Sequence, residues 1–137
     1  MQKILYYNLY KGIDTLESKF GEHPEEVDAS IDIHSSLKHG GGSVSRGFTP
    51  CLTRTKCGSN GFWLTSRNRV LSTTELLRLQ GIDPARLVLP PELKVPALRC
   101  MIGNSYSMNV AGRVMLALFK TIGAIPNDYP DVWAPPV

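Results

Sequence analysis

One apolar segment near the C-terminal end limits what this chain can fold into more than any other feature. Apolar residues recur at helical intervals from Met108 to Ile122, and Gly123 follows as a stop. The pattern predicts a helix of about four to five turns whose start, at 103–105, carries cap-forming residues. Apolar residues also fill much of the opposite side, so the helix needs to be buried from several directions. Arg113 interrupts the segment, which is therefore a poor membrane span.

A shorter helix is predicted upstream by its start and stop signals. Ser72 and Glu75 have the spacing of a capping box, in which each side chain closes an unpaired backbone N–H. Leu71 and Leu76 are placed for a hydrophobic staple, and Gly81 can adopt the left-handed conformation that ends a helix. These local signals predict a helix of about two turns.

Weaker signals cover the rest of the chain. Residues 5–20 carry an apolar stripe that predicts a helix ending at Gly21, and the alternation over 27–33 predicts a strand. The glycines at 40–42 lack the lysine and the serine or threonine of a phosphate loop, which favours a flexible connector. Four prolines within 82–96 exclude a continuous helix and predict a semi-rigid connector.

Charge and aromatic residues are unevenly distributed. Residues 1–34 carry three Lys/Arg against seven Asp/Glu, whereas residues 35–78, the basic block, carry seven against one. A basic block of this kind favours contact with nucleic-acid phosphates. Tyr6, Tyr7 and Tyr10 could stack on bases, but their spacing is more typical of core or rim packing.

Two segments, RVLSTTELLRLQG at 69–81 and IGNSYSMNVAGRVMLALF at 102–119, together resemble the closing motifs of a DNA cytosine-5 methyltransferase. The first is similar to the ninth motif, R-x-L-[TS]-x-x-E-x-x-R-L-Q-G, through Arg69, Leu71, Ser72, Glu75, Arg78, Leu79, Gln80 and Gly81. The second is similar to the tenth motif, I-G-N-[AS]-[VY], through Ile102, Gly103, Asn104, Ser105 and Tyr106, with Ser107 where many members carry proline. A third stretch, Pro50 to Arg54 with Gly58 and Gly61, is similar to the segment that leaves the target-recognition region.

The resemblance implies an α/β fold, namely the C-terminal portion of a Rossmann-like S-adenosylmethionine-dependent methyltransferase with the end of its small target-recognition domain. Residues 1–68 would be the end of the target-recognition region and a basic DNA-facing loop. Residues 69–125 would be the ninth- and tenth-motif helices that return to the methyltransferase domain, and residues 126–137 a proline-rich tail that frays.

The resemblance also implies which residues bind ligands. The expected contributors to a shared, incomplete S-adenosyl-L-methionine pocket are Asn104, Ser105 and Tyr106. The candidates for DNA phosphate contact are Thr53, Arg54, Lys56 and Arg69, since loops of small and basic residues position DNA through its backbone. Glu75 and Arg78 are expected to organise the helix, because a half-buried charge must be paired.

The residues that perform the family's chemistry are not found. That chemistry resembles attack by a cysteine thiolate on a flipped cytosine, assisted by a glutamate. No Pro-Cys-Gln, Glu-Asn-Val or Phe-x-Gly-x-Gly sequence occurs, and Cys51 is followed by Leu52. Cys51 is therefore interpreted as a semi-buried structural cysteine, and no catalytic residue is predicted. The three cysteines and three histidines lack the spacing of a metal site.

These features predict the C-terminal portion of a DNA (cytosine-5) methyltransferase that contributes to cofactor and DNA binding and is inactive alone. Its expected partners are DNA and the missing catalytic half, from the same gene or a separate chain, and no membrane. An intracellular location is expected, nuclear in a eukaryote. Without the catalytic half, the helix after Asn104 should expose apolar area and promote aggregation. The alternatives are a helix-turn-helix DNA-binding module built from 72–79 and 84–89, and a relic fragment that binds neither ligand.

Overall fold

The chain combines a small antiparallel sheet with helices on either side, as seen in a computed structural model that describes residues 2–132 and 134. The α-helices are α1 (Gln2–Thr15), α2 (Arg54–Gly58), α3 (Thr73–Leu79), α4 (Val95–Asn104) and α5 (Met108–Thr121). The strands are β1 (Ala29–Asp32), β2 (Val44–Arg46), β3 (Phe62–Leu64) and β4 (Arg69–Val70). A π-helical turn η1 (Leu16–Phe20) and the 3-10 turns η2 (Pro24–Glu26), η3 (Leu37–His39), η4 (Thr65–Arg67) and η5 (Pro84–Arg86) link them.

The four strands form one sheet in the order β2-β1-β3-β4, and every neighbouring pair is antiparallel. Ile31 on β1 lies opposite Val44 of β2 and Trp63 of β3. The expectation of a mixed α/β chain is confirmed at this coarse level. The predicted division between residues 68 and 69 falls in the turn between β3 and β4, and these two strands pair.

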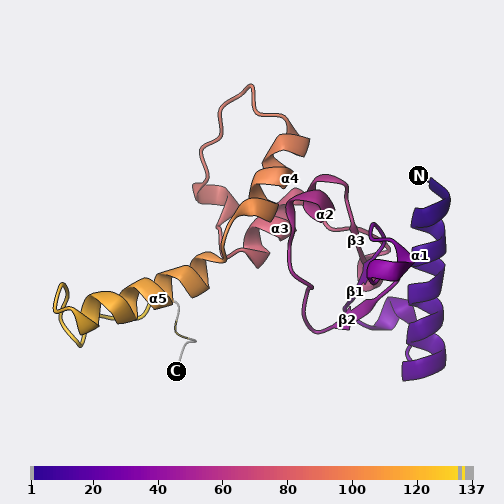
Figure 1. The fold of residues 1–137 in the computed structure, drawn as a ribbon, viewed down its shortest axis with the longest axis horizontal. Helices are drawn as coiled ribbons and strands as arrows, with labels where there is room; N and C mark the ends of the chain where they lie inside the picture. Colours follow the sequence, from indigo (N-terminus) through magenta and orange to yellow (C-terminus); the bar gives the residue numbers. More distant parts are fainter. Residues whose placement is uncertain (1, 133, 135–137) are drawn as a thin grey trace.

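The helix α1 lies beside the sheet (Figure 1), and the first of two apolar clusters lies between them. The predicted N-terminal helix is confirmed: α1 and η1 run on to Gly21, whose φ of 66° ends them. A side chain at Gly12 would collide with Ile31, so the glycine permits close packing of α1 on β1. The buried residues of this cluster are Leu16, Ala29, Ile31 and Ile33.

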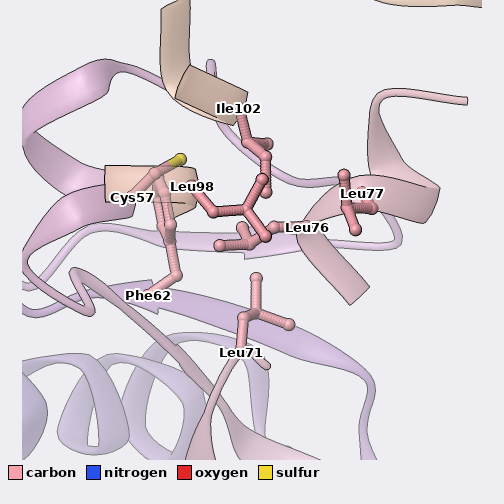
Figure 2. Packing of buried hydrophobic residues seen from close by; sticks show 7 residues of the cluster. All are labelled: Cys57, Phe62, Leu71, Leu76, Leu77, Leu98 and Ile102. Carbon is pink, nitrogen blue, oxygen red and sulfur yellow. The ribbon is translucent and has the colours of Figure 1, made fainter. Parts of the chain in front are cut away.

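The second cluster joins α2, β3, α3 and α4 (Figure 2). Leu76 and Leu77 project from α3 into this cluster, and Leu98 and Ile102 project from α4. Its remaining buried members are Cys57, Phe62 and Leu71. Leu71 and Leu76 belong to the same cluster, as the staple prediction requires.

Of two expectations for the N-terminal part, the strand is confirmed and the flexible connector is wrong. The predicted strand is present as β1, but its polar residues Ser30 and Asp32 are as buried as the apolar ones, because other segments cover both faces. The glycines at 40–42 do not form a flexible connector. Gly41 and Gly42 are buried, and a side chain at Gly41 would collide with the carbonyl oxygen of Ser35.

The region between the two predicted helices contains a helix that the sequence pattern did not predict. Residues 82–94 contain the 3-10 turn η5 and a hydrogen-bonded turn at 91–92, but α4 begins at Val95, with Pro96 in its first turn. Because α4 continues to Asn104, this residue ends a helix and does not cap the next one. The predicted C-terminal helix begins later, at Met108, and its N-cap residue Ser107 makes no side-chain capping bond.

The helix α5 extends away from the rest of the molecule, on the side opposite α1 (Figure 1). None of its residues is buried, so the predicted exposure of apolar area on this helix is confirmed. Arg113 pairs with Asp131 of the returning tail at 2.9 Å. The predicted fraying of the tail falls in part on residues 133 and 135–137, which lie outside the described residues. Within the part that the structure describes, no helix has the length and apolar character to cross a membrane.

Candidate functional site

The turn that joins α4 to α5 is held by one side chain of the ninth-motif segment. The Nε2 atom of Gln80 donates to the carbonyl oxygens of Ile102 at 3.0 Å and Ser105 at 3.3 Å. The carbonyl oxygen of Gln80 in turn accepts from the backbone N–H of Met108 at 2.8 Å. Gln80 is itself buried, so its amide and carbonyl fix both the end of α4 and the start of α5.

Two glycines allow the neighbouring segments to approach this turn. Gly81 has a φ of 74°, and a side chain there would collide with Asn109 of α5. A Cβ atom at Gly103 would lie 2.5 Å from the backbone of Thr53 and Arg54. The three sequence stretches that carry the methyltransferase resemblance, around 53, 80 and 103, therefore meet at one place.

Arg99 is a buried residue of this region that sequence reasoning missed. Its Nε atom donates to the carbonyl oxygen of Cys57 at 2.7 Å, and its Nη1 atom donates to the carbonyl oxygen of Leu71 at 3.1 Å. A longer bond of 3.4 Å reaches the hydroxyl of Thr73. Burial lowers the pKa of Arg99, and among the described residues no carboxylate pairs with it. Arg99 thus ties α4 to α2 and to the start of α3.

The three candidate cofactor residues follow one another at the surface. Tyr106 is 86% exposed, and Asn104 and Ser105 are exposed as well. The hydroxyl of Ser105 donates to the carbonyl oxygen of Ile102 at 2.7 Å, so it helps to end α4. An open groove of about 390 Å³ begins at Tyr106 and runs along the apolar side of α5. Its lining residues are Tyr106, Ser107, Val110, Ala111, Val114 and Met115, so of the three candidates Tyr106 contributes to it.

Among the four candidate DNA contacts, three already have structural partners. The Thr53 hydroxyl accepts from the backbone N–H of Lys56 and so caps α2. The Lys56 ammonium lies 2.7 Å from the buried carboxylate of Asp32. Burial alone would raise the pKa of Asp32, but the Lys56 bond and donors from residues 34 and 35 lower it overall. Arg54 is exposed and forms no ion pair within the described part of the chain.

The fourth candidate, Arg69, forms a two-pronged ion pair with Glu75. Both guanidinium–carboxylate distances are 2.8 Å, and Glu75 also closes the capping box with Ser72. The Arg69 bond, with those from Ser72, lowers the pKa of Glu75 to about 2. Glu75 therefore has the organising position expected of it, and Arg69 shares that role. Arg78, the other expected organiser, is exposed, and no ion pair is found for it among the described residues.

Ion pairs reduce the free charge of the basic block. Arg46 pairs with Glu22, and Lys56 pairs with Asp32, so two of its cations are matched by acids of residues 1–34. Within the described residues, four of its cations lack an ion pair, namely Lys38, Arg54, Arg67 and Arg78. The positive charge available to a ligand is therefore smaller than the sequence indicates.

The environment of Cys51 differs from the predicted one. Cys51 is exposed, so its interpretation as semi-buried was wrong. Cys57 is fully buried in the second cluster, and burial raises the pKa of its thiol. Among the described residues, no group of His, Cys, Asp and Glu side chains could hold a metal ion.

Comparisons with known proteins provide no identification. No family model, no curated protein and no solved structure matches this chain.

Proposed function

We propose that the chain is the C-terminal portion of a DNA (cytosine-5) methyltransferase, which contributes to S-adenosyl-L-methionine and DNA binding and is inactive without a catalytic half. The observation that carries the proposal is the meeting of the three resembling stretches at Gln80, Gly81, Gly103 and Thr53, which we call the junction. A capping box alone would account for Ser72 and Glu75. The junction also accounts for Gln80, Gly81 and Gly103, which a simple surface helix does not need.

The exposed side of α5 supports the need for a second polypeptide. Its groove is apolar and open, and Tyr106 stands at one end. An open apolar wall with few polar groups fits one side of a ligand pocket whose other side comes from elsewhere. In the proposed enzyme the cofactor supplies the methyl group, and Tyr106 would contact the cofactor from the α5 side of the pocket. Arg54 would contact DNA phosphate beside the junction.

The helix-turn-helix alternative has less structural support. Its first helix exists as α3, but its second, over 84–89, is the three-residue turn η5. A recognition helix must present several side chains to the major groove, and one 3-10 turn is too short for that.

The test is reconstitution with the catalytic half, cloned from the same genome and ending before its ninth motif. Methyl transfer from radiolabelled S-adenosyl-L-methionine to duplex DNA should appear when both polypeptides are mixed, and be absent with either alone. Gln80→Leu should abolish the reconstituted activity because the junction loses its donor. Arg86→Leu, at an exposed site on η5, should not.

Titrations of the isolated chain with duplex DNA and with S-adenosyl-L-methionine separate the alternatives. The proposal expects weak or no cofactor binding until the catalytic half is added. Duplex binding that is unchanged by that half would favour a DNA-binding module. Binding of neither ligand under any condition would identify a relic.

A further inference from the structure

Three tyrosines on α1 are exposed, contrary to the expectation of core or rim packing. Tyr6, Tyr7 and Tyr10 are 72%, 56% and 73% exposed. They fall on one side of the helix because residues three and four apart share a face. The opposite side of α1, with Leu9 and Ile13, packs on the sheet, so the tyrosines are not needed for the fold.

Grooves flank this side of α1 on both edges. One, of about 430 Å³, lies between α1 and η3, and its lining includes Ile4, Tyr7 and Leu37. The other, of about 360 Å³, lies towards β3, and its lining includes Tyr6 and Trp63. Each groove thus has an exposed tyrosine on its wall and apolar side chains beside it, which suits a flat aromatic ring.

The charge beside Tyr6 and Tyr7 is positive. Lys3 and Lys38 line the groove between α1 and η3, and neither forms an ion pair with the described residues. Lys11 lies on the same helix and donates to the carbonyl oxygen of Gly41. No acidic residue precedes Asp14, which is exposed and shares the side of the helix with Tyr10, four residues earlier. The positive charge is therefore concentrated at the N-terminal end of the tyrosine side, around Lys3 and Lys38.

We propose that this surface, the tyrosine face (Tyr6, Tyr7 and Tyr10 with Lys3 and Lys38), binds single-stranded nucleic acid. Bases stack on the tyrosine rings, and the phosphates lie beside the two lysines. Stacking of bases on aromatic side chains combined with a basic groove is a sequence-tolerant way to bind unpaired strands. A duplex keeps its bases stacked inside the helix and offers no base faces to these rings. The tyrosine face is separate from the junction around Gln80 and does not rest on the proposed methyltransferase function.

The test is fluorescence anisotropy with a labelled oligothymidylate of about 20 nucleotides, longer than the usual site size. It uses the full chain, at concentrations where light scattering shows no aggregation. The triple variant Tyr6→Leu, Tyr7→Leu, Tyr10→Leu should bind at least about tenfold more weakly, since each stacked base contributes about 1–3 kcal/mol and about 1.4 kcal/mol is tenfold. The corresponding triple Phe variant should stay within about twofold, because the rings remain.

Matched variants separate stacking from other causes. Tyr129→Leu removes an exposed tyrosine outside α1 and should leave the affinity unchanged. Lys3→Gln with Lys38→Gln should lower the slope of log affinity against log salt by about 1.4, since each phosphate contact on a single strand contributes about 0.7. Circular dichroism of each variant checks that the helix content of the chain is unchanged.

Three outcomes would overturn the proposal. These are absence of binding to the oligothymidylate, equal binding by a folded triple Leu variant, and stronger binding to a duplex of the same length or to anionic phospholipid vesicles. Because the assay needs neither cofactor nor catalytic half, failure of the methyltransferase proposal would not change its result.

Discussion

Replacement of Arg99 by methionine should destabilise the chain strongly, although it removes a buried positive charge. Methionine fills a similar volume but cannot donate to the carbonyl oxygens of Cys57 and Leu71. A buried carbonyl left without a donor costs about 1–3 kcal/mol, so the two together cost about 2–6 kcal/mol. The variant no longer buries a charged guanidinium, and this gain in free energy offsets part of the cost. We expect a net loss of about 2–4 kcal/mol in the free energy of unfolding.

Urea unfolding followed by circular dichroism measures this loss. With a slope of about 2 kcal/mol per molar urea, the middle of the usual range, the midpoint should fall by roughly 1–2 M. Arg86→Met, at an exposed arginine, should change the free energy by no more than about 0.5 kcal/mol. Arg99→Lys keeps the charge but loses the forked donors, so its urea midpoint should lie between those of Arg99→Met and Arg86→Met. If Arg99→Met unfolds at the same urea concentration as Arg86→Met, Arg99 does not hold α4 to α2 and α3.

Three further predictions concern other parts of the structure. The pKa of Glu75 is lowered to about 2 by Arg69, so the stability from this pair is present above the ordinary carboxyl pKa and is lost as pH falls towards 2. Acid titration of the parent should therefore show a steeper loss of stability below the ordinary pKa than titration of Glu75→Gln, and parallel curves would contradict the pair. Gly103→Ala should lower the free energy of unfolding in urea by about 1–3 kcal/mol, because the added Cβ atom would press on backbone atoms that cannot move aside. An unchanged urea midpoint would show that this close approach is absent. The double variant Val110→Gln, Val114→Gln should bind less of a hydrophobic fluorescent dye at an unchanged urea midpoint, whereas undiminished dye fluorescence would place the exposed apolar area elsewhere.

Features whose causes are close in sequence were predicted well. The start of α3 depends on Ser72 and Glu75, and its capping box is present as expected. The end of the N-terminal helix depends on Gly21, which has the left-handed conformation that its position indicates. In both cases the residues that determine the structure lie within one or two turns of each other.

Features that depend on distant partners were not predicted. Four prolines in 82–96 suggested a connector, but Pro96 falls in the first turn of α4, where its missing N–H costs nothing. Burial of Asp32 depends on Lys56, and burial of Arg99 depends on carbonyl groups in other segments. No local pattern around either residue indicates those partners. The same reason explains why the candidate DNA contacts could be named while their ion pairs could not.

The isolation of α5 has a consequence for the rates at which backbone amides exchange with solvent. A helix of 14 residues is marginal in water without tertiary packing, and none of the α5 side chains is buried. Its amide hydrogens should therefore exchange with deuterium much faster than those of β1 or α3, whose opening requires disruption of a buried cluster. A polypeptide that binds along α5 would slow exchange at 108–121 first. Mass spectrometry of deuterium uptake over this helix can therefore detect a binding partner in a mixture of proteins whose identities are unknown.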